Sequence, residues 1–562
     1  MLSLASLTVR LWGPVFPIRA QDPDGGQSQV VSDSVHCTHR RLRYAVAPAL
    51  LAALLAAGSP AVAAVDDEAV TTGPAGPAAT ARPQTQAEAR PRLMPLDRPL
   101  GAVADGPVPD PDTVSRALSD ELETDWLGPE DRRAITVRDA LTGQVLTESN
   151  AGRPVTPAST TKILSAAAIV TGLPVQQTFT TRVVTGAAAD EVVLVAGGDM
   201  LLARGAGDPG AVAGHAGVAD LAAQTADALE AGGVPGPVSV GLDLQHVAGP
   251  HQLDTWSDFW VSEGYAGRIV QLGLAEDLAL PFYPSPTDPE QEVARAFAAA
   301  LEDAGVEVVG WEGEDEAQDW TAELVETPAG TVGLTRPAAD PAAQERGTVT
   351  QAPDGAPATE EPGGEIAGAE VLAQVESAAL RDVLALALAA SDNAMVEQLA
   401  RQAAVTDGGS ADREAVTAWI RRSVEEDYGV DLTGLELADA SGLSDGTLLT
   451  VDVVADLLVA AADGSRPDLQ TVLAAGGLPI AGYTGTLSSR FHLPVHEAGV
   501  GNARAKTGSL PGVTSLAGTV VSADGRLLVY SLTADDIGED AAVLEARSSL
   551  DEVVAQLARC GC

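Results

Sequence analysis

The sequence predicts an α/β (α+β) fold in which one domain of strands and helices is interrupted by a large insertion. First, alternating apolar residues at Ile135 and Val137 lead into a Thr-Gly turn and a second apolar stretch, which is typical of a β-hairpin. Second, the Ala-rich apolar run over 163–173 is typical of a buried helix. Third, the interval from Lys162 to Ser391 is too long for a loop of a compact domain, so it is expected to fold by itself.

The predicted domain has a first part over 113–175 and a second part over 371–562, and one or two smaller inserted domains occupy 176–370. Its elements follow from runs of apolar residues at strand or helix period, separated by turn residues. In chain order we expect a hairpin over 132–150, a helix over 163–173, strands over 179–186 and 190–199, helices over 218–231 and 289–304, a helical run over 378–404, two or three strands within 505–535 and a last helix over 540–559.

The bulk composition indicates a folded, acidic protein. Hydrophobic residues make up 45% of the chain, but aromatic residues make up only 3%, so Ala, Val and Leu must fill the core. The formal net charge is −46, and an acidic surface repels a phosphate backbone. We therefore expect no nucleic acid partner.

Residues 1–64 are predicted to be a leader that contains a signal peptide. Basic residues at positions 40, 41 and 43 precede an apolar core over 44–57, and small residues follow it. An uncleaved anchor is the alternative, because the apolar stretch approaches the roughly 20 residues that span a bilayer. Membrane association is expected only in that case. The Ala- and Pro-rich segment 65–112 is expected to be a flexible tether. These features predict a secreted or cell-envelope protein that acts outside the cytoplasmic membrane.

Only two lysines occur in the chain, since 31 of its 33 Lys and Arg residues are Arg. Exposed Lys and Arg serve solubility equally well, so the lysines that remain should lie where Arg fails. A buried Lys can lose its proton and act as a base, whereas Arg stays protonated. Lys162 and Lys506 are therefore candidate functional residues.

Both lysines fall in short motifs that carry polar chemistry. Ser159 and Lys162 are three residues apart and share a face of a helix, so the Lys amine can take the Ser proton. Ser391-Asp392-Asn393 precedes a helical run. Lys506-Thr507-Gly508 opens a strand, where Gly508 would let a substrate lie against the strand edge. Alone, these motifs would be interpreted as a core helix, a helix N-cap and a turn.

In this order the motifs are the signature of active-site serine penicillin-binding proteins and class A β-lactamases. The chain resembles the class C penicillin-binding proteins, the D-alanyl-D-alanine carboxypeptidase/endopeptidase family, through six stretches. The long insertion separates it from a class A β-lactamase. Met200 stands where this family usually has Pro, and Asp445 stands where Arg is common. The stretches are PASTTKILSAAA, LVAGGDMLL, VESAALRDVLALALAASDNAMVEQLAR, ADASGLSDGTLLT, TGTLSSRF and ARAKTGSL.

The resemblance implies a penicillin-binding-protein/β-lactamase-like transpeptidase domain and a role for each motif residue. Ser159 would be the nucleophile, Lys162 its base, and Ser391 the relay that protonates the leaving amine. Asn393 would bind the substrate amide or hold Lys162. The third motif would bind substrate: Lys506 and Thr507 would receive its carboxylate, Gly508 would give it room, and the N–H of Ser509 would join that of Ser159 in an oxyanion hole. Burial, or a nearby positive charge such as that of Lys506, is also expected to lower the pKa of Lys162.

The expected substrates are peptidoglycan stem peptides ending in D-Ala-D-Ala, with cross-link cleavage as a further reaction, and β-lactam antibiotics are expected as covalent inhibitors. No cofactor is expected, and no His-Glu-x-x-His or other metal-ligand spacing occurs. A β-lactamase or esterase using the same residues is one alternative, and a cell-wall binding protein with a decayed site is another. The terminal Cys560-Gly561-Cys562 could close a small ring or stay reduced, and we assign it no function.

Overall fold

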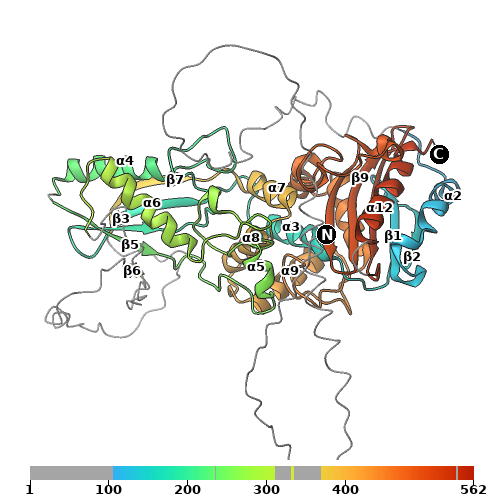
Figure 1. Cartoon of the computed structure of the whole chain (residues 1–562), viewed down its shortest axis with the longest axis horizontal. Coiled ribbons are helices and arrows are strands. Elements are labelled where there is room, and N and C mark those ends of the chain that lie inside the picture. Colours follow the sequence, from blue (N-terminus) through green and yellow to red (C-terminus); the bar gives the residue numbers. More distant parts are fainter. Residues whose placement is uncertain (1–105, 235, 310–330, 334–368, 539–541, 562) are drawn as a thin grey trace, which may run out of the picture.

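The computed structural model describes residues 106–234, 236–309, 331–333, 369–538 and 542–561 (Figure 1). The predicted leader, with its apolar core over 44–57, and most of the predicted tether lie outside these residues. Within the described ranges, no helix combines the length and the apolar character that crossing a bilayer requires. Cys560 is disulfide-bonded, and its partner lies outside the described residues.

The first sheet joins the two ends of the described chain. Its five strands are antiparallel in the order β2-β1-β10-β9-β8. The predicted hairpin is present as β1 and β2, and β1 pairs with β10 in a register that sets Arg133 opposite Ala534. The strand β8, which carries the third motif, is an edge of this sheet. The strands span Arg133–Asp139 (β1), Val145–Ser149 (β2), Arg504–Leu510 (β8), Val513–Val521 (β9) and Leu527–Ala534 (β10).

Helices cover both faces of the first sheet, which explains the unbroken apolar run of β10. Side chains of a strand alternate between its two faces. Leu527 and Val529 pack against the core that contains α10, whereas Leu528 and Tyr530 pack against the core that contains α2 and α12. Each fully buried apolar side chain of this kind contributes roughly 1.5–3 kcal/mol. The helices span Pro111–Leu122 (α2), Val451–Ala462 (α10) and Ala542–Arg559 (α12).

Four helices lie between the first sheet and the inserted region (Figure 1). The predicted helical run over 378–404 is two helices, because the chain turns at Ser391, which has a left-handed φ of 58°, and Asp392 then caps the second helix. The helix after the first motif is buried along most of its length, as its Ala-rich sequence predicts. The helices span Thr161–Gly172 (α3), Leu380–Ala390 (α7), Asn393–Thr406 (α8) and Arg413–Tyr428 (α9).

The inserted region forms a second sheet in the order β6-β5-β4-β3-β7, on which α4 and α6 pack. The strands β4 and β5 are parallel and are connected through α4, while the other pairs are antiparallel. The boundary predicted at 370 needs correction, because β7 pairs with β3 of the inserted sheet. The elements span Thr180–Thr185 (β3), Glu191–Val195 (β4), Ser239–Asp243 (β5), Thr331–Gly333 (β6), Val371–Glu376 (β7), Val218–Gly232 (α4) and Pro289–Asp303 (α6).

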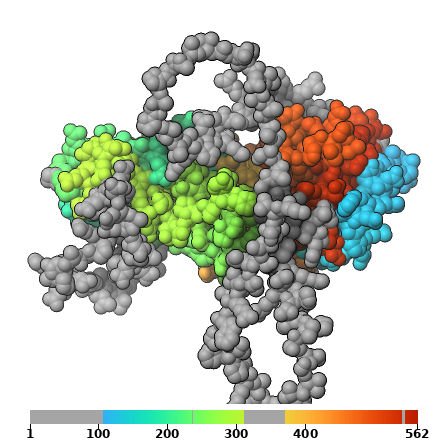
Figure 2. All heavy atoms as spheres, in the orientation of Figure 1, coloured from blue at the N-terminus to red at the C-terminus, as the bar shows by residue number. Residues whose placement is uncertain are grey.

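The two sheets lie at opposite ends of the described part of the molecule (Figure 1). The space-filling view shows that this part is elongated (Figure 2). Short helices complete the described chain and lie mainly in its connections. They span Asp125–Leu127 (η3), Glu130–Arg132 (η4), Ala158–Thr160 (η5), Asp258–Ser262 (α5), Ala275–Asp277 (η6), Pro467–Leu469 (α11), Gln470–Gly477 (η7), Gly485–Leu487 (η8) and Pro494–Gly499 (η9).

Candidate active site

The first motif lies where a tight turn enters α3. Ala158 has a left-handed φ of 49°, and Ser159 follows it in η5. The carbonyl oxygen of Pro157 accepts hydrogen bonds from Thr160 Oγ1 and Ser515 Oγ, both at 2.7 Å. Because Ser515 belongs to β9, these bonds fix the turn to the first sheet.

Lys162 lies with its amine in contact with Ser159. The side chain is fully buried, and Nζ lies 3.1 Å from Ser159 Oγ. Nζ also donates to Asn393 Oδ1 at 2.6 Å and to the carbonyl oxygen of Ser441 at 2.8 Å. Burial lowers the pKa of Lys162 to about 8, although three carboxylates, Asp439, Glu397 and Asp392, favour the charged form. A usable fraction of this amine is therefore neutral near neutral pH.

A loop after α9 presents the carbonyl of Ser441 to Lys162. Asp439 organises this loop: its carboxylate accepts from the backbone N–H groups of Ser441, Gly442 and Ser444 at 3.1, 2.6 and 2.7 Å. Glu397 of α8 accepts from the same Ser441 N–H at 2.8 Å, and burial raises the pKa of Glu397 to about 8. The sequence analysis quoted this loop but assigned no role to Glu397 or Asp439. An Asp followed by small residues is a signal for such a turn.

The second motif connects α7 to α8. Ser391 ends α7, and Asp392 caps α8 by accepting from Met395 N–H at 2.9 Å. Asn393 is the first residue of α8; its Oδ1 holds the Lys162 amine, and its Nδ2 donates to the carbonyl oxygen of Tyr265 at 3.2 Å. The motif thus contains the N-cap that the sequence analysis weighed and also a direct contact with the first motif. Tyr265, which comes from the inserted region, was missed.

The third motif brings the second lysine to the second motif. Lys506 is fully buried, and its Nζ donates to Ser391 Oγ and to the carbonyl oxygen of Thr507, both at 2.8 Å. Burial and the positive charge of Lys162 hold the pKa of Lys506 well below its ordinary value. We expected burial or the charge of Lys506 to lower the pKa of Lys162. Of these two causes, burial is the one that lowers it.

Gly508 is required for packing between the first and third motifs. A Cβ at this position would lie 2.1 Å from Ser515 Oγ and 2.7 Å from the carbonyl oxygen of Pro157. The direction in which a side chain of residue 508 would extend is therefore filled by Ser515 and by the turn before Ser159. A side chain here would push this turn away from β8.

The other hydroxyls of the third motif contact groups that the sequence analysis did not identify. Thr507 Oγ1 donates to Thr486 Oγ1 at 2.9 Å. Ser509 Oγ donates to the carbonyl oxygen of Gly508 at 2.7 Å and accepts from Arg547 Nε at 3.3 Å. No local pattern marks Arg547, because it lies on the last helix among ordinary helical residues. These contacts extend the site along β8 toward α12.

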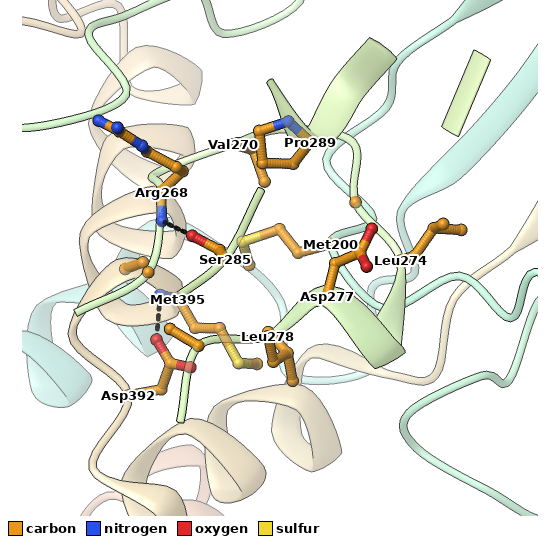
Figure 3. A pocket seen from close by; sticks show the side chains of 14 residues that line it. Met200, Arg268, Val270, Leu274, Asp277, Leu278, Ser285, Pro289, Asp392 and Met395 are labelled. Atoms are coloured by element: carbon orange, nitrogen blue, oxygen red, sulfur yellow. Dashed lines mark hydrogen bonds between the residues drawn. The ribbon is translucent and has the colours of Figure 1, made fainter. Parts of the chain in front are cut away.

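A pocket beside the second motif is separate from this centre (Figure 3). Asp392, the N-cap of α8, and Met395 of α8 lie on one side of it, and Met200 and Asp277 of the inserted region lie on the other. None of the predicted catalytic or substrate-binding residues lines the pocket. Met200, one departure from the family pattern, thus lies here, and Asp445, the other, is exposed.

The described residues contain no group of three or more His, Cys, Asp or Glu side chains that could hold a metal ion. The hydrogen bonds of the candidate active site form two serine-lysine pairs. Lys162 bonds to Ser159 and also to Asn393 and Ser441. Lys506 bonds to Ser391.

Comparisons with known proteins identify the family. Residues 115–277 and 358–557 match the D-Ala-D-Ala carboxypeptidase 3 (S13) family. A carboxypeptidase of Mycobacterium tuberculosis is 32% identical over 433 residues, which are 76% of this chain and 80% of that protein. Carboxypeptidase DacB of Mycolicibacterium smegmatis is 30% identical over 522 residues, covering 92% and 95%.

The crystal structure of penicillin-binding protein 4 (dacB) from Haemophilus influenzae is similar in fold. It matches with a TM-score of 0.50 at 18% identity, over 79% of this chain and 98% of that chain. The resemblance that the motifs predicted is confirmed, and so is the α/β fold. The chain belongs to the D-Ala-D-Ala carboxypeptidase 3 (S13) family and is a serine-type cell-wall peptidase.

Proposed function

We propose that the protein is an exported D,D-carboxypeptidase that removes the last D-Ala from peptidoglycan stem peptides through an acyl-enzyme. Cleavage of D,D cross-links is a second reaction of the same site, and penicillin acylates it. The observation that carries the proposal is the 3.1 Å contact between Ser159 Oγ and the buried Lys162 amine, which is partly neutral near neutral pH.

The first half of the reaction forms an ester on Ser159. Neutral Lys162 takes the hydroxyl proton while Oγ bonds to the carbonyl carbon of the penultimate D-Ala. The backbone N–H groups of Ser159 and Ser509 would stabilise the oxyanion, and a donor of this kind contributes about 2.7–4 kcal/mol to the transition state. The C–N bond then breaks, and the proton reaches the leaving amine through Ser391.

The second half releases the product and restores the enzyme. A water molecule attacks the ester carbonyl, Lys162 accepts a proton from it, and Ser159 regains its hydroxyl hydrogen as the shortened peptide leaves. Asn393 supports both halves, because its Oδ1 holds the Lys162 amine at 2.6 Å. In penicillin the cleaved amide is in a ring, so the leaving group stays attached and blocks the water.

Location outside the cytoplasmic membrane belongs to the same proposal. It is supported by the basic and apolar pattern over 40–57 and by the D-Ala-D-Ala family, whose substrate class is in the cell wall. Fractionation of cells that make the full chain tests it. Recovery of the protein in the cytoplasm alone would contradict export without affecting the chemistry.

The decisive experiment incubates the full-length protein with labelled penicillin and maps the adduct by mass spectrometry. We expect the label on the peptide that contains Ser159, no label on Ser159→Ala, and release of D-Ala from an acyl-D-Ala-D-Ala peptide by the wild type only. Label that persists in Ser159→Ala contradicts the nucleophile. Rapid release of opened penicillin supports a β-lactamase, and binding without D-Ala release supports a decayed site.

A further inference from the structure

A cation from α12 lies beside the end of β8. Arg547 of α12 is partly buried and donates from Nε to Ser509 Oγ at 3.3 Å. Within the described ranges, no carboxylate lies at ion-pair distance from its guanidinium. Asp551, on the same helix, pairs instead with Arg490 at 2.6 Å. A partly buried charge without a counter-ion is costly, so an anionic ligand at this position would be stabilised.

Hydroxyl groups lie on the same side of β8 as this cation. Residues two apart on a strand face the same way, so Thr507 and Ser509 share a face. Their contacts agree with this: Thr507 Oγ1 meets Thr486 Oγ1, and Ser509 Oγ meets Arg547. A hydroxyl can rotate its hydrogen toward a new acceptor, so a guanidinium beside two hydroxyls matches a carboxylate in charge and geometry once they turn from Thr486 and Gly508.

Lys506, the other cation of the motif, is less suited to this task. Its amine already donates to Ser391 Oγ and to the carbonyl oxygen of Thr507. Its charged form is also disfavoured by full burial and by Lys162. Burial lowers the pKa of Arg547 to about 10, so Arg547 still carries its charge at neutral pH.

We infer that Arg547 is a specificity-determining residue that binds the terminal carboxylate of the substrate together with Thr507 and Ser509. The inference rests on the proposed function and revises its assignment, because the carboxylate was expected to lie on Lys506 and Thr507. Lys506 then serves the proton relay at Ser391, and the charge that selects the substrate comes from α12.

A pair of substrates that differ only in the carboxylate tests this inference. An acyl-D-alanyl thiolester of thioglycolate presents a carboxylate, and its methyl ester does not, while the cleaved bond is the same. We expect Arg547→Gln to lower kcat/KM for the acid about 10- to 100-fold, as loss of a charge-assisted hydrogen bond does. The methyl ester should change within about twofold, and Arg547→Lys should recover part of the loss.

Arg559→Gln is the matched control, since Arg559 is an exposed residue of the same helix that bonds to Val495 and Gln556. It should leave both substrates unchanged. Equal losses on acid and ester in Arg547→Gln, or no loss on either, overturn the inference while the wild-type activity upholds the proposed function. A wild type that hydrolyses neither substrate overturns both.

Discussion

Lys162 and Lys506 are both fully buried amines bonded to a serine, yet their electrostatic surroundings are opposite. Three carboxylates favour the charged form of Lys162, and its pKa stays near 8. For Lys506, burial and the positive charge of Lys162 both act in one direction and hold its pKa well below the ordinary value. Burial therefore lowers the pKa of both amines, and the nearby carboxylates limit this lowering at Lys162. The first lysine is thus adapted to exchange protons and the second to donate a hydrogen bond.

The largest expected effect comes from Lys162→Arg, which replaces the exchangeable amine by a permanent cation. Because a guanidinium keeps its proton, acylation by penicillin should fall by about 10²- to 10⁴-fold, the usual contribution of a general base. Stopped-flow measurement with a fluorescent penicillin checks this, and thermal unfolding shows whether the variant is folded. Acylation at the wild-type rate would show that the charge of residue 162, and not its proton exchange, is what matters.

A smaller loss is expected from Asn393→Asp, which places a fourth carboxylate against Lys162. A carboxylate next to a lysine raises its pKa by 1–3 units, so acylation at pH 7 should fall about 10- to 10³-fold and recover as the pH rises. Asn393→Asp keeps an oxygen that accepts from Lys162 and loses only the Nδ2 donor to Tyr265, whereas the control, Asn393→Ala, removes both hydrogen bonds and adds no charge. If the two variants share one pH profile, the carboxylates do not set the proton occupancy of Lys162.

The wild type should itself depend on pH through Lys162. Below a pKa of about 8 the neutral fraction of the amine grows about tenfold per pH unit, so the acylation rate constant should rise with pH and level off above 8. The second-order rate constant for penicillin, measured from pH 6 to 9 on the free enzyme, reports this. A flat profile contradicts a titrating base.

The smallest change is expected for Glu397→Gln. Ionised Glu397 stabilises charged Lys162, so its removal should move the rise in rate to lower pH. The gain at pH 7 should be under about tenfold, since a carboxyl with a pKa near 8 is mostly protonated there. The Gln Oε1 can still accept from Ser441 N–H. Glu397→Ala, which removes this acceptor, should lose activity. If the rise in rate moves to higher pH in Glu397→Gln, the carboxylate does not raise the pKa of Lys162.

The sequence predicted those features that local patterns encode. The alternation around Ile135 and the buried helix after Ser159 depend on nearby residues, and both are present. The turn at Ser391, which divides the helical run predicted over 378–404, was not predicted. The rarity of lysine indicated both amines. Features that depend on pairing across the fold were missed, as with β7, whose sheet is decided by its partner β3.

The same distinction applies within the site. Gly508 was identified from its motif, but the reason for it, contact with the turn at Pro157, requires the packed structure. Arg547 and Tyr265 lie in segments with no polar motif. Each contacts the site through one hydrogen bond, to Ser509 and from Asn393 respectively, which the sequence spacing does not predict. Asp439 had a local signal in the small residues that follow it, but its effect on Lys162 acts through space.

The pairing of β1 with β10 has a consequence for biosynthesis. The catalytic sheet cannot close until a ribosome has made nearly the whole chain, whereas the inserted sheet is complete once residue 376 has emerged. Strand pairs so distant in sequence form slowly, and earlier units fold first during synthesis. An unfinished chain therefore has a formed insertion but no assembled nucleophile, so acylating ability appears only with the completed molecule.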